Sequence, residues 1–290
     1  MTGKLTLCAT PIGNLEDITL RVLRILREAD LIAAEDTRNS LKLLTHFDIH
    51  TPLTSYHEYN KIEKGRILIK KMQEGCHIAL VTDAGTPGIS DPGEELVRMC
   101  WEEGIEVESL PGPSAVVTAL TVSGLATRRF AFEAFLPADK KERKRILTEL
   151  REETRTIILY EAPHHLLQTL QDLVDALGDR KAVLCRELTK LHETITRATL
   201  QELISQYTDQ KPLGECVLVI EGMDPRVRDQ DMLREWQSVS IEDHVAYYEK
   251  QGMDRKAAMK QAAVDRGVSK REVYQACIQG KNAENTLKSL

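Results

Sequence analysis

Residues 77–93 have the sequence HIALVTDAGTPGISDPG, in which an apolar run is followed by a long turn. The run His77–Thr82 is nearly apolar throughout, which is typical of a strand in a parallel sheet that is covered on both faces. The eleven residues after it include three glycines, two prolines and two aspartates. Open α/β sheets bind ligands beyond the carboxyl ends of their strands. This stretch therefore predicts an α/β fold with a ligand site at Asp83–Gly93.

Strand and helix patterns alternate over the first half of the chain. Short apolar runs predict strands at Lys4–Ala9, Leu31–Ala34, Pro52–Tyr56, His77–Thr82 and Ile105–Leu110. Helical patterns occur at Leu41–Phe47, Ile62–Met72 and Glu94–Glu103, and Asp17 is the candidate cap of an earlier helix whose apolar face is Ile18, Val22, Leu23, Ile25, Leu26 and Ala29. The alternation predicts a layered α/β domain over residues 1–112.

The segment Leu110–Ser114, with the sequence LPGPS, interrupts this rhythm and is the candidate hinge. A second α/β set is predicted over residues 113–223. Its strands are expected at Phe130–Phe135, Thr156–Tyr160, Ala182–Arg186, Thr194–Ala198 and Cys216–Ile220, and its helices at Lys141–Arg151, His165–Leu177 and Leu200–Gln206. Because Thr194–Ala198 alternates and has short connections, part of this sheet is expected to be antiparallel.

Residues 224–290 form a third predicted region, a small all-α module of the helix-turn-helix kind. Helices are expected at Ile241–Gln251, Arg255–Arg266 and Lys270–Gln279, with Gly252 and Gly267 between them and Ser269 as a cap. Residues 253–272 carry a local net charge of +3. Two interpretations stay open for this region, a solvated face on a dimerisation bundle and a nucleic-acid contact.

The overall composition excludes several classes of protein. The formal net charge is −6, so any nucleic acid must be met by a local basic patch. No stretch approaches the roughly 18 consecutive apolar residues of a membrane span, and the first apolar run is too short for a signal peptide. Six scattered cysteines without a CxxC pair disfavour zinc and disulfides, which indicates a reducing cytoplasm.

Three more loops at predicted strand ends have unusual compositions. They are Thr10–Leu15, Pro111–Ala115 and Tyr160–His165. None contains GxGxxG, and the chain has no GxxxxGK[ST], so dinucleotide and ATP sites are disfavoured. The loop Asp83–Gly93, rich in carbonyls and poor in cations, suits a positively charged ligand, although a merely tight turn is the alternative. Adjacent histidines diverge in direction, so we expect no metal site at His164 and His165.

Charged residues cluster at three predicted strand ends, Ala34–Arg38, Ser55–Glu58 and Arg186–Lys190. Each charge taken singly is equally well explained as a surface ion pair. Doubly wound folds nevertheless place their functional polar groups at strand ends, so the three clusters together are candidates for the site.

Taken together, these segments resemble one family closely. The motifs are ATPIGNLEDIT (9–19), AAEDTR (33–38), SYHE (55–58), LVTDAGTPGISDPG (80–93), LPGPSA (110–115), FLP (135–137), YEAPH (160–164), RELTK (186–190) and GECVLVIEG (214–222). They are similar to those of the ribosomal RNA small subunit methyltransferase I family, within the tetrapyrrole methylase-like class III methyltransferases. The resemblance covers roughly residues 4–222, and the helical tail is also similar to that family's C-terminal module.

The resemblance implies two α/β subdomains with a cofactor cleft between them. It implies transfer of a methyl group from S-adenosylmethionine to the ribose 2′-hydroxyl of a cytidine in the decoding region of 16S rRNA, within the 30S subunit, by a cytoplasmic homodimer. The family's pattern places the cofactor against Pro11, Gly85, Thr86, Ile89, Ser90, Ser114, Ala115, Tyr160 and Ala162. Capping of the next helix is an equal explanation for Ser114.

A ribose hydroxyl is a weak nucleophile, so we expect a base, with Asp36, Glu35 and His57 as candidates. Asp36→Asn is predicted to reduce turnover and to spare cofactor binding. Arg38 and Lys190 are candidates for steering RNA phosphates. The basic run Lys140, Lys141, Arg143, Lys144 and Arg145 is a candidate RNA contact, with a solvated helix start as the alternative. One position departs from the family, since His165 stands where an arginine is usual, and no role is assigned to it.

Two rival functions remain at this point. The first is a small-molecule methylase of the same fold acting on a tetrapyrrole, against which the aromatic content of 4% speaks because few rings are available to pack a macrocycle. The second is a helix-turn-helix regulator whose α/β body senses a ligand. It predicts sequence-specific DNA binding without methyl transfer, and the net charge of +1 on the tail disfavours it.

Overall fold

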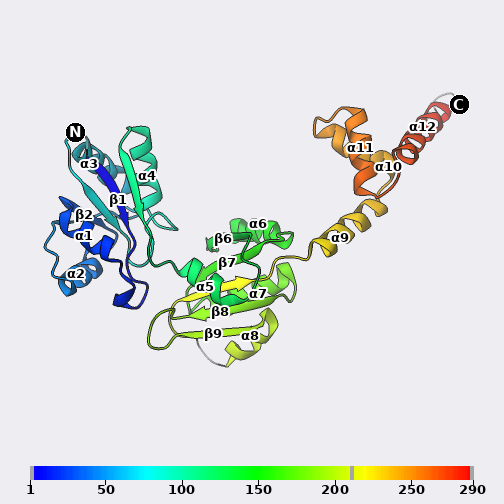
Figure 1. Ribbon diagram of the computed structural model, residues 1–290. Coiled ribbons are helices and arrows are strands. Elements are labelled where there is room, and N and C mark those ends of the chain that lie inside the picture. The colour runs from blue at the N-terminus through cyan, green and yellow to red at the C-terminus, as the bar shows by residue number, and fades with distance from the viewer. Residues whose placement is uncertain (1–2, 210–211, 288–290) are drawn as a thin grey trace. The chain divides into compact units, whose positions relative to one another are not determined.

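The computed structural model describes residues 3–209 and 212–287 of the 290-residue chain. The chain divides into two compact units, Met1–Gly222 and Met223–Leu290. The first unit holds two five-stranded sheets, and in the second the described residues form helices (Figure 1). Within the described ranges, no helix is both long enough and apolar enough to cross a membrane.

The first sheet is entirely parallel, with the strand order β3-β2-β4-β1-β5. Its elements are β1 (Lys4–Cys8), α1 (Leu20–Glu28), β2 (Leu31–Ala34), α2 (Thr37–His46), β3 (Leu53–Ser55), α3 (Lys61–Gln73), β4 (Ile78–Val81), α4 (Gly93–Glu102) and β5 (Glu106–Leu110). In β4, Ile78 and Leu80 pack with side chains of α3 and α4, whereas Ala79 and Val81 pack with those of α1 and α2. Burial on both faces explains why this run is apolar throughout.

The second sheet is mixed, with the order β6-β7-β10-β8-β9. Its elements are α5 (Ala115–Ser123), β6 (Phe130–Phe135), α6 (Lys140–Arg151), β7 (Thr156–Glu161), α7 (Leu166–Leu177), β8 (Lys181–Arg186), β9 (Thr194–Thr199), α8 (Leu200–Thr208) and β10 (Cys216–Ile220). Only β6 and β7 pair in parallel, which confirms the predicted antiparallel part.

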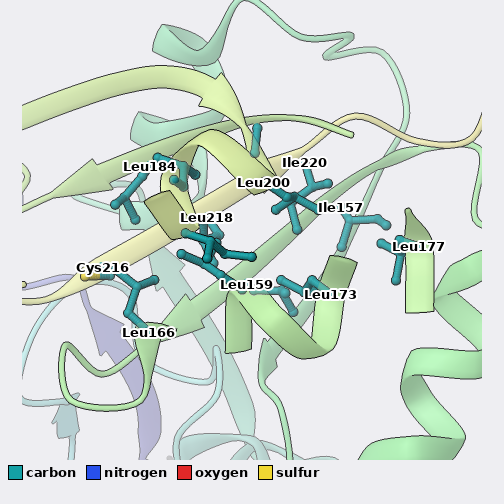
Figure 2. Close-up of a cluster of buried hydrophobic side chains, with 14 of the residues drawn as sticks. Ile157, Leu159, Leu166, Leu173, Leu177, Leu184, Leu200, Cys216, Leu218 and Ile220 are labelled. Atoms are coloured by element: carbon teal, nitrogen blue, oxygen red, sulfur yellow. The ribbon is translucent and has the colours of Figure 1, made fainter. Parts of the chain in front are cut away.

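Two cores cover the faces of this second sheet. On one face Leu159 and Leu218 of the sheet pack against Leu166 and Leu173 of α7, as Figure 2 shows, and side chains of α6 and α8 join the same cluster. On the other face α5 packs against β7, β8 and β10, with Val116 in the cluster. The single helix α5 therefore anchors the residues that follow the predicted hinge to the second sheet.

The second unit contains α9 (Pro225–Ser238), α10 (Ile241–Lys250), α11 (Arg255–Asp265) and α12 (Lys270–Leu287). Its core is small and is built from Val245, Ala258, Ala262, Val273 and Cys277. The Trp236 ring stacks on His244 with centroids 3.5 Å apart, which ties α9 to α10. Ser269 accepts a hydrogen bond from the Glu272 backbone N–H, so its predicted capping role is confirmed.

The element predictions are largely confirmed, and the exceptions have local causes. Asp17 does not cap α1. It lies in a 3₁₀ turn, η1 (Leu15–Asp17), and the Thr19 side chain accepts the capping bond from Val22 N–H. Helix α2 begins four residues earlier than predicted because the Asp36 carboxylate caps it. Helix α9 was not predicted from the sequence.

Candidate active site

The loops after β1, β4 and β5 are joined to one another at the carboxyl edge of the first sheet. Thr10 and Gly85 form an isolated antiparallel bridge, with N···O distances of 2.9 and 3.0 Å. The Thr86 hydroxyl donates to the Pro113 carbonyl over 2.9 Å. Since these loops follow adjacent strands of a parallel sheet, they meet at the edge where such folds bind ligands.

The loop after β4 holds its shape through one of its own carboxylates. Asp91 accepts hydrogen bonds from the backbone N–H groups of Gly88, Ile89 and Gly93 over 2.9, 3.1 and 2.8 Å. Ser90 has a φ of +64°, an unusual conformation for a residue with a side chain. These bonds hold the proline-rich and glycine-rich sequence in a rigid turn. Part of the hydrogen-bonding capacity of the Asp91 carboxylate is therefore used within the loop.

A cleft of about 450 Å³ lies between these loops and the second sheet. The residues that line it come from both halves of the first unit. They are Ile12, Glu35, Thr82, Asp83, Ala84, Gly85, Thr86, Ile89, Ser90, Asp91, Ser114, Ala115, Phe135, Tyr160, Glu161, Ala162, Pro163, Glu215, Cys216 and Val217.

The charged residues that line the cleft all have the same sign. They are Glu35, Asp83, Asp91, Glu161 and Glu215, and the described lining contains no lysine, arginine or histidine. Glu215 pairs with Lys190, which lies outside the lining, and the other four carboxylates make no ion pair with the described residues. Unpaired carboxylates repel phosphates and attract a cationic ligand. The donor set therefore fits a sulfonium compound such as S-adenosylmethionine and does not fit a nucleotide phosphate.

An aromatic cluster forms part of the wall contributed by the second sheet. The Tyr160 ring packs edge-on against Phe132, with centroids 4.9 Å apart, and at a tilt against Phe135 at 5.6 Å. Burial raises the pKa of Tyr160, so its hydroxyl stays protonated near neutral pH. Beside it, the buried Glu161 carboxylate accepts a hydrogen bond from the Thr169 hydroxyl.

Most of the predicted cofactor residues line this cleft. Those that do are Gly85, Thr86, Ile89, Ser90, Ser114, Ala115, Tyr160 and Ala162. Pro11 does not, and its neighbour Ile12 takes the place instead. Ser114 occupies the N-cap position of α5, but its side chain makes no capping hydrogen bond, so the capping explanation is wrong. Their role as cofactor contacts stays a prediction.

The candidate bases differ in their access to the cleft. Glu35 lines it and accepts a hydrogen bond from the Thr82 hydroxyl over 2.7 Å. Asp36 does not line it, and its carboxylate binds Arg38 through the backbone N–H at 2.8 Å and the guanidinium at 2.7 Å. The hydrogen bonds from Arg38 lower the pKa of Asp36 to about 2. So acidic a carboxyl is a weak proton acceptor, and the geometry favours Glu35.

His57 also lies outside the lining of the cleft. Its Nε2 faces Asn60 Nδ2 at 3.2 Å, and its backbone N–H donates to Asn60 Oδ1 over 2.8 Å. Its buried Nδ1 has no hydrogen-bond partner among the described residues. The structure thus places His57 in the turn that precedes α3 and does not bring it together with Glu35 at the cleft.

The predicted RNA-contact residues fall into two groups. The first is paired with carboxylates: Arg38 with Asp36, Arg143 with Asp172, Arg145 with Glu149, and Lys190 with Glu187 and Glu215. The second, Lys140, Lys141 and Lys144, is exposed and has no hydrogen bond or ion pair with the described part of the chain. Only the second group presents uncompensated charge, so the basic patch is smaller than predicted.

Arg143 in particular is a structural residue. Its Nε donates to Asp172 over 2.6 Å, and its Nη2 donates to the Thr169 hydroxyl over 2.8 Å. Thr169 in turn donates to Glu161, so the chain of bonds runs from α6 through α7 to the wall of the cleft. Two of the five guanidinium N–H groups are thus occupied within the protein, so Arg143 is less available to phosphate than the neighbouring lysines, and its RNA contact stays a prediction.

A second and larger cavity, of about 910 Å³, adjoins the cleft. It is a groove between α6 and α7, and it shares Phe135, Glu161 and Ala162 with the lining of the cleft. Lys140, Lys144 and Arg151 also line this groove.

Sequence reasoning gave no individual role to several residues that line the cleft, although Asp83 and Ala84 belong to the loop predicted to bind the ligand. Those without an individual role are Thr82, Asp83, Ala84, Phe135, Glu161, Pro163 and Glu215–Val217. All of them belong to motifs that were quoted above, so the signal was present. The missing knowledge was which residues of each motif turn toward the cleft, and this depends on backbone geometry that the motif alone does not specify.

The chain is similar to proteins of known family. A model of the tetrapyrrole (corrin/porphyrin) methylases matches residues 4–204. Over 272 residues the chain is 50% identical to ribosomal RNA small subunit methyltransferase I of Halalkalibacterium halodurans, with 94% of this chain and 93% of that protein covered. It is 48% identical over 278 residues to the Synechocystis protein of the same name, with 96% and 98% covered.

The fold is likewise that of a solved methyltransferase. The uroporphyrin-III C-methyltransferase of Thermus thermophilus, solved in complex with S-adenosylhomocysteine, aligns with a TM-score of 0.54 at 20% identity, covering 78% of this chain and all of that one. This likeness shows that the two chains share a fold. The chain belongs to the ribosomal RNA small subunit methyltransferase I family of tetrapyrrole methylase-like proteins.

Proposed function

We propose that this protein is an S-adenosylmethionine-dependent rRNA methyltransferase that methylates the ribose 2′-hydroxyl of a cytidine in the decoding region of 16S rRNA. The observation that carries the proposal is the cleft, whose described lining holds five carboxylates, only Glu215 of them in an ion pair, and no basic side chain. The family relationship supplies the substrate class, because the relatives at 48–50% identity are named rRNA small subunit methyltransferases.

In the proposed reaction, an O–C bond forms at the ribose and the C–S bond of S-adenosylmethionine breaks, leaving neutral S-adenosylhomocysteine and a proton. Bound in the cleft, the cofactor supplies the electrophilic methyl group. The carboxylates attract the cationic donor more strongly than the uncharged thioether, and this difference favours exchange of product for fresh donor. The rigid turn around Asp91 and the wall at Tyr160 orient the donor, which is the main requirement of an in-line transfer.

The proton of the 2′-hydroxyl requires an acceptor as the O–C bond forms. Glu35 fills this role in the proposal, since it lines the cleft and the Thr82 hydroxyl donates to its Oε2 over 2.7 Å. That bond fixes one oxygen and leaves the other with free acceptor capacity. Asp36 and His57 stay as weaker candidates because neither lines the cleft.

The proposal places the reaction on the 16S rRNA of the 30S subunit, in the cytoplasm, with the enzyme as a homodimer. These statements extend the family resemblance. The exposed lysines of α6, Lys140, Lys141 and Lys144, supply the phosphate contacts that an acidic protein needs for RNA binding.

Mass-spectrometric mapping of ribose methylation tests the proposal. The purified protein and S-adenosylmethionine are incubated with 30S subunits from cells that lack the enzyme, and in parallel with a porphyrinoid or with duplex DNA. We expect one methylated cytidine in 16S rRNA and no other product. Methylation of the porphyrinoid alone would establish the small-molecule reaction instead, and tight duplex binding without methyl transfer would indicate a regulator.

A further inference from the structure

Phe135 is an exposed aromatic residue at the junction of the two cavities. Its side chain lines both the carboxylate cleft and the groove between α6 and α7, and the residue is 54% exposed. Its ring leans on Tyr160, with centroids 5.6 Å apart. An exposed ring between two connected cavities has a free face that a ligand spanning them would meet.

An irregularity in β6 brings Phe135 to this place. Phe132 pairs with Ile158 of β7, but Phe135 pairs with Tyr160, so three residue steps on β6 oppose two on β7. Side chains alternate between the faces of a sheet, so without this bulge Phe135 would lie on the face opposite Phe132. With it, Phe135 and Phe132 both contact Tyr160.

The bulge is built from an unfavourable backbone conformation. Ala134 has a φ of +52°, in the left-handed region that residues with a side chain rarely adopt. Conformations of this kind concentrate at functional sites, where the surrounding structure maintains them. Glycine would fit this position without strain, and the chain uses alanine there.

The two cavities that meet at Phe135 differ in electrostatic character. On the cleft side the charged side chains are all carboxylates. On the groove side Lys140, Lys144 and Arg151 are exposed and make no ion pair with the described residues, Arg143 and Asp172 neutralise each other, and the remaining carboxylates are Asp175 and the shared Glu161. A nucleotide has a planar base and an anionic phosphate, and this arrangement matches both parts.

We propose that Phe135 is the stacking platform for a base of the acceptor RNA, at or beside the methylated nucleotide. The phosphates of the strand lie toward Lys140 and Lys144, and the ribose faces the cleft where the donor binds. The inference rests on the proposed function and specifies how the RNA enters the site. Aromatic side chains commonly bind unstacked RNA bases in this way.

A series of variants at Phe135 tests the proposal. Stacking is worth about 1–3 kcal/mol per base, so Phe135→Leu should lower kcat/KM for 30S subunits about tenfold or more. Phe135→Tyr should retain most of the activity because the ring is kept. The dissociation constant of S-adenosylmethionine should be unchanged in both, and Phe132 still holds Tyr160 from the other side.

Phe130→Leu is the matched control. Phe130 lies on the same strand and is 40% exposed, but it lines neither cavity. This variant should methylate 30S subunits as the wild type does, and thermal unfolding of each variant checks that the sheet is intact.

Two outcomes would overturn the inference. If Phe135→Leu methylates 30S subunits like wild type, the ring binds no base. If instead the variant loses affinity for S-adenosylmethionine at an unchanged KM for 30S subunits, Phe135 belongs to the cofactor wall. Failure of the proposed function is distinguishable from both, because then the wild-type protein itself would not methylate the 30S subunit.

Discussion

The Thr82 hydroxyl donates a hydrogen bond to Glu35 Oε2 over 2.7 Å, which links the ends of β4 and β2 at the cleft. The bond orients a carboxylate that makes no ion pair with any basic side chain in the described ranges. Its neighbour Asp36, in contrast, is held by Arg38. The two adjacent acids thus have separate roles, one facing the cleft and one capping α2.

This contrast predicts the outcome of a matched pair of variants. Glu35→Gln should reduce kcat on 30S subunits by a factor of about 10²–10⁴, the usual contribution of a general base. Asp36→Asn should cost much less, because asparagine still caps a helix. Single-turnover methyl transfer measures both, with calorimetry of S-adenosylmethionine binding as the check on the cleft. If Asp36→Asn reduced kcat more than Glu35→Gln does, Asp36 would be the better candidate for the base.

The loop after β4 depends on Asp91. Asp91→Ala removes the acceptor of three backbone N–H groups and should destabilise the first unit by about 1–3 kcal/mol. It should also weaken S-adenosylmethionine binding, since Ile89 and Ser90 line the cleft. Urea unfolding and calorimetry report the two effects. Glu63→Ala is a suitable control, because this exposed carboxylate lies on α3 and its side chain makes no hydrogen bond or ion pair with the described residues.

The exposed lysines of α6 predict a change in salt dependence. Replacing Lys140, Lys141 and Lys144 by glutamate should weaken RNA binding and lower the slope of log K against log salt by about 2–3, since each phosphate contact contributes about 0.7–0.9. Filter binding to 30S subunits at several salt concentrations measures the slope. The same change at Lys42, Lys70 and Lys71, which are exposed on α2 and α3, controls for net charge. An unaltered slope would show that the α6 lysines do not contact RNA.

The bulge in β6 predicts opposite effects of one substitution at two positions. Ala134→Gly should stabilise the protein by about 0.5–1 kcal/mol, because it relieves a left-handed alanine at the cost of some backbone entropy. Ala131→Gly, on the same strand with ordinary backbone geometry and a buried side chain, should be destabilising. Chemical unfolding of both variants gives the sign. A loss of stability in Ala134→Gly would contradict the assigned strain.

An ion pair near the start of β7 predicts an acid-sensitive contribution to stability. The hydrogen bond from Arg155 lowers the pKa of Glu153 from 4.5 to about 2. The unfolded chain binds this proton first, so the contribution is present above pH 4.5 and is lost as the pH falls toward 2. Glu153→Gln should therefore reduce stability at pH 6 and flatten its decline between pH 4.5 and 2. If the free energy of unfolding depended on pH in the same way in the variant and the wild type, the stabilising ion pair between Glu153 and Arg155 would be contradicted.

The sequence predicted most of the fold because its signals are local. Apolar runs such as Ile78–Val81 locate strands buried on both faces, and the motif loops lie at strand ends in any doubly wound fold. Helix α9 was missed because few of its residues are apolar, and its link to α10 is the stacking of Trp236 on His244. The cap of α1 was assigned to Asp17 instead of Thr19 because both residue types favour the N-cap position and the two lie only two positions apart.

The site was less predictable because it depends on contacts between distant segments. Arg143 and Lys144 are adjacent and chemically alike, yet only Arg143 meets Asp172, which lies 29 residues away. Pro11 and Ile12 differ in whether they reach the cleft through the direction of one turn. Phe135 became a candidate only when the register of β6 against β7 was known.

The bridge between Thr10 and Gly85 has a consequence for the two loops that it connects. Because each backbone N–H donates to the other residue's carbonyl, the ends of β1 and β4 cannot separate without breaking both bonds. The loops after β1 and β4 are therefore joined, and a substitution that displaces one of them is expected to displace the other.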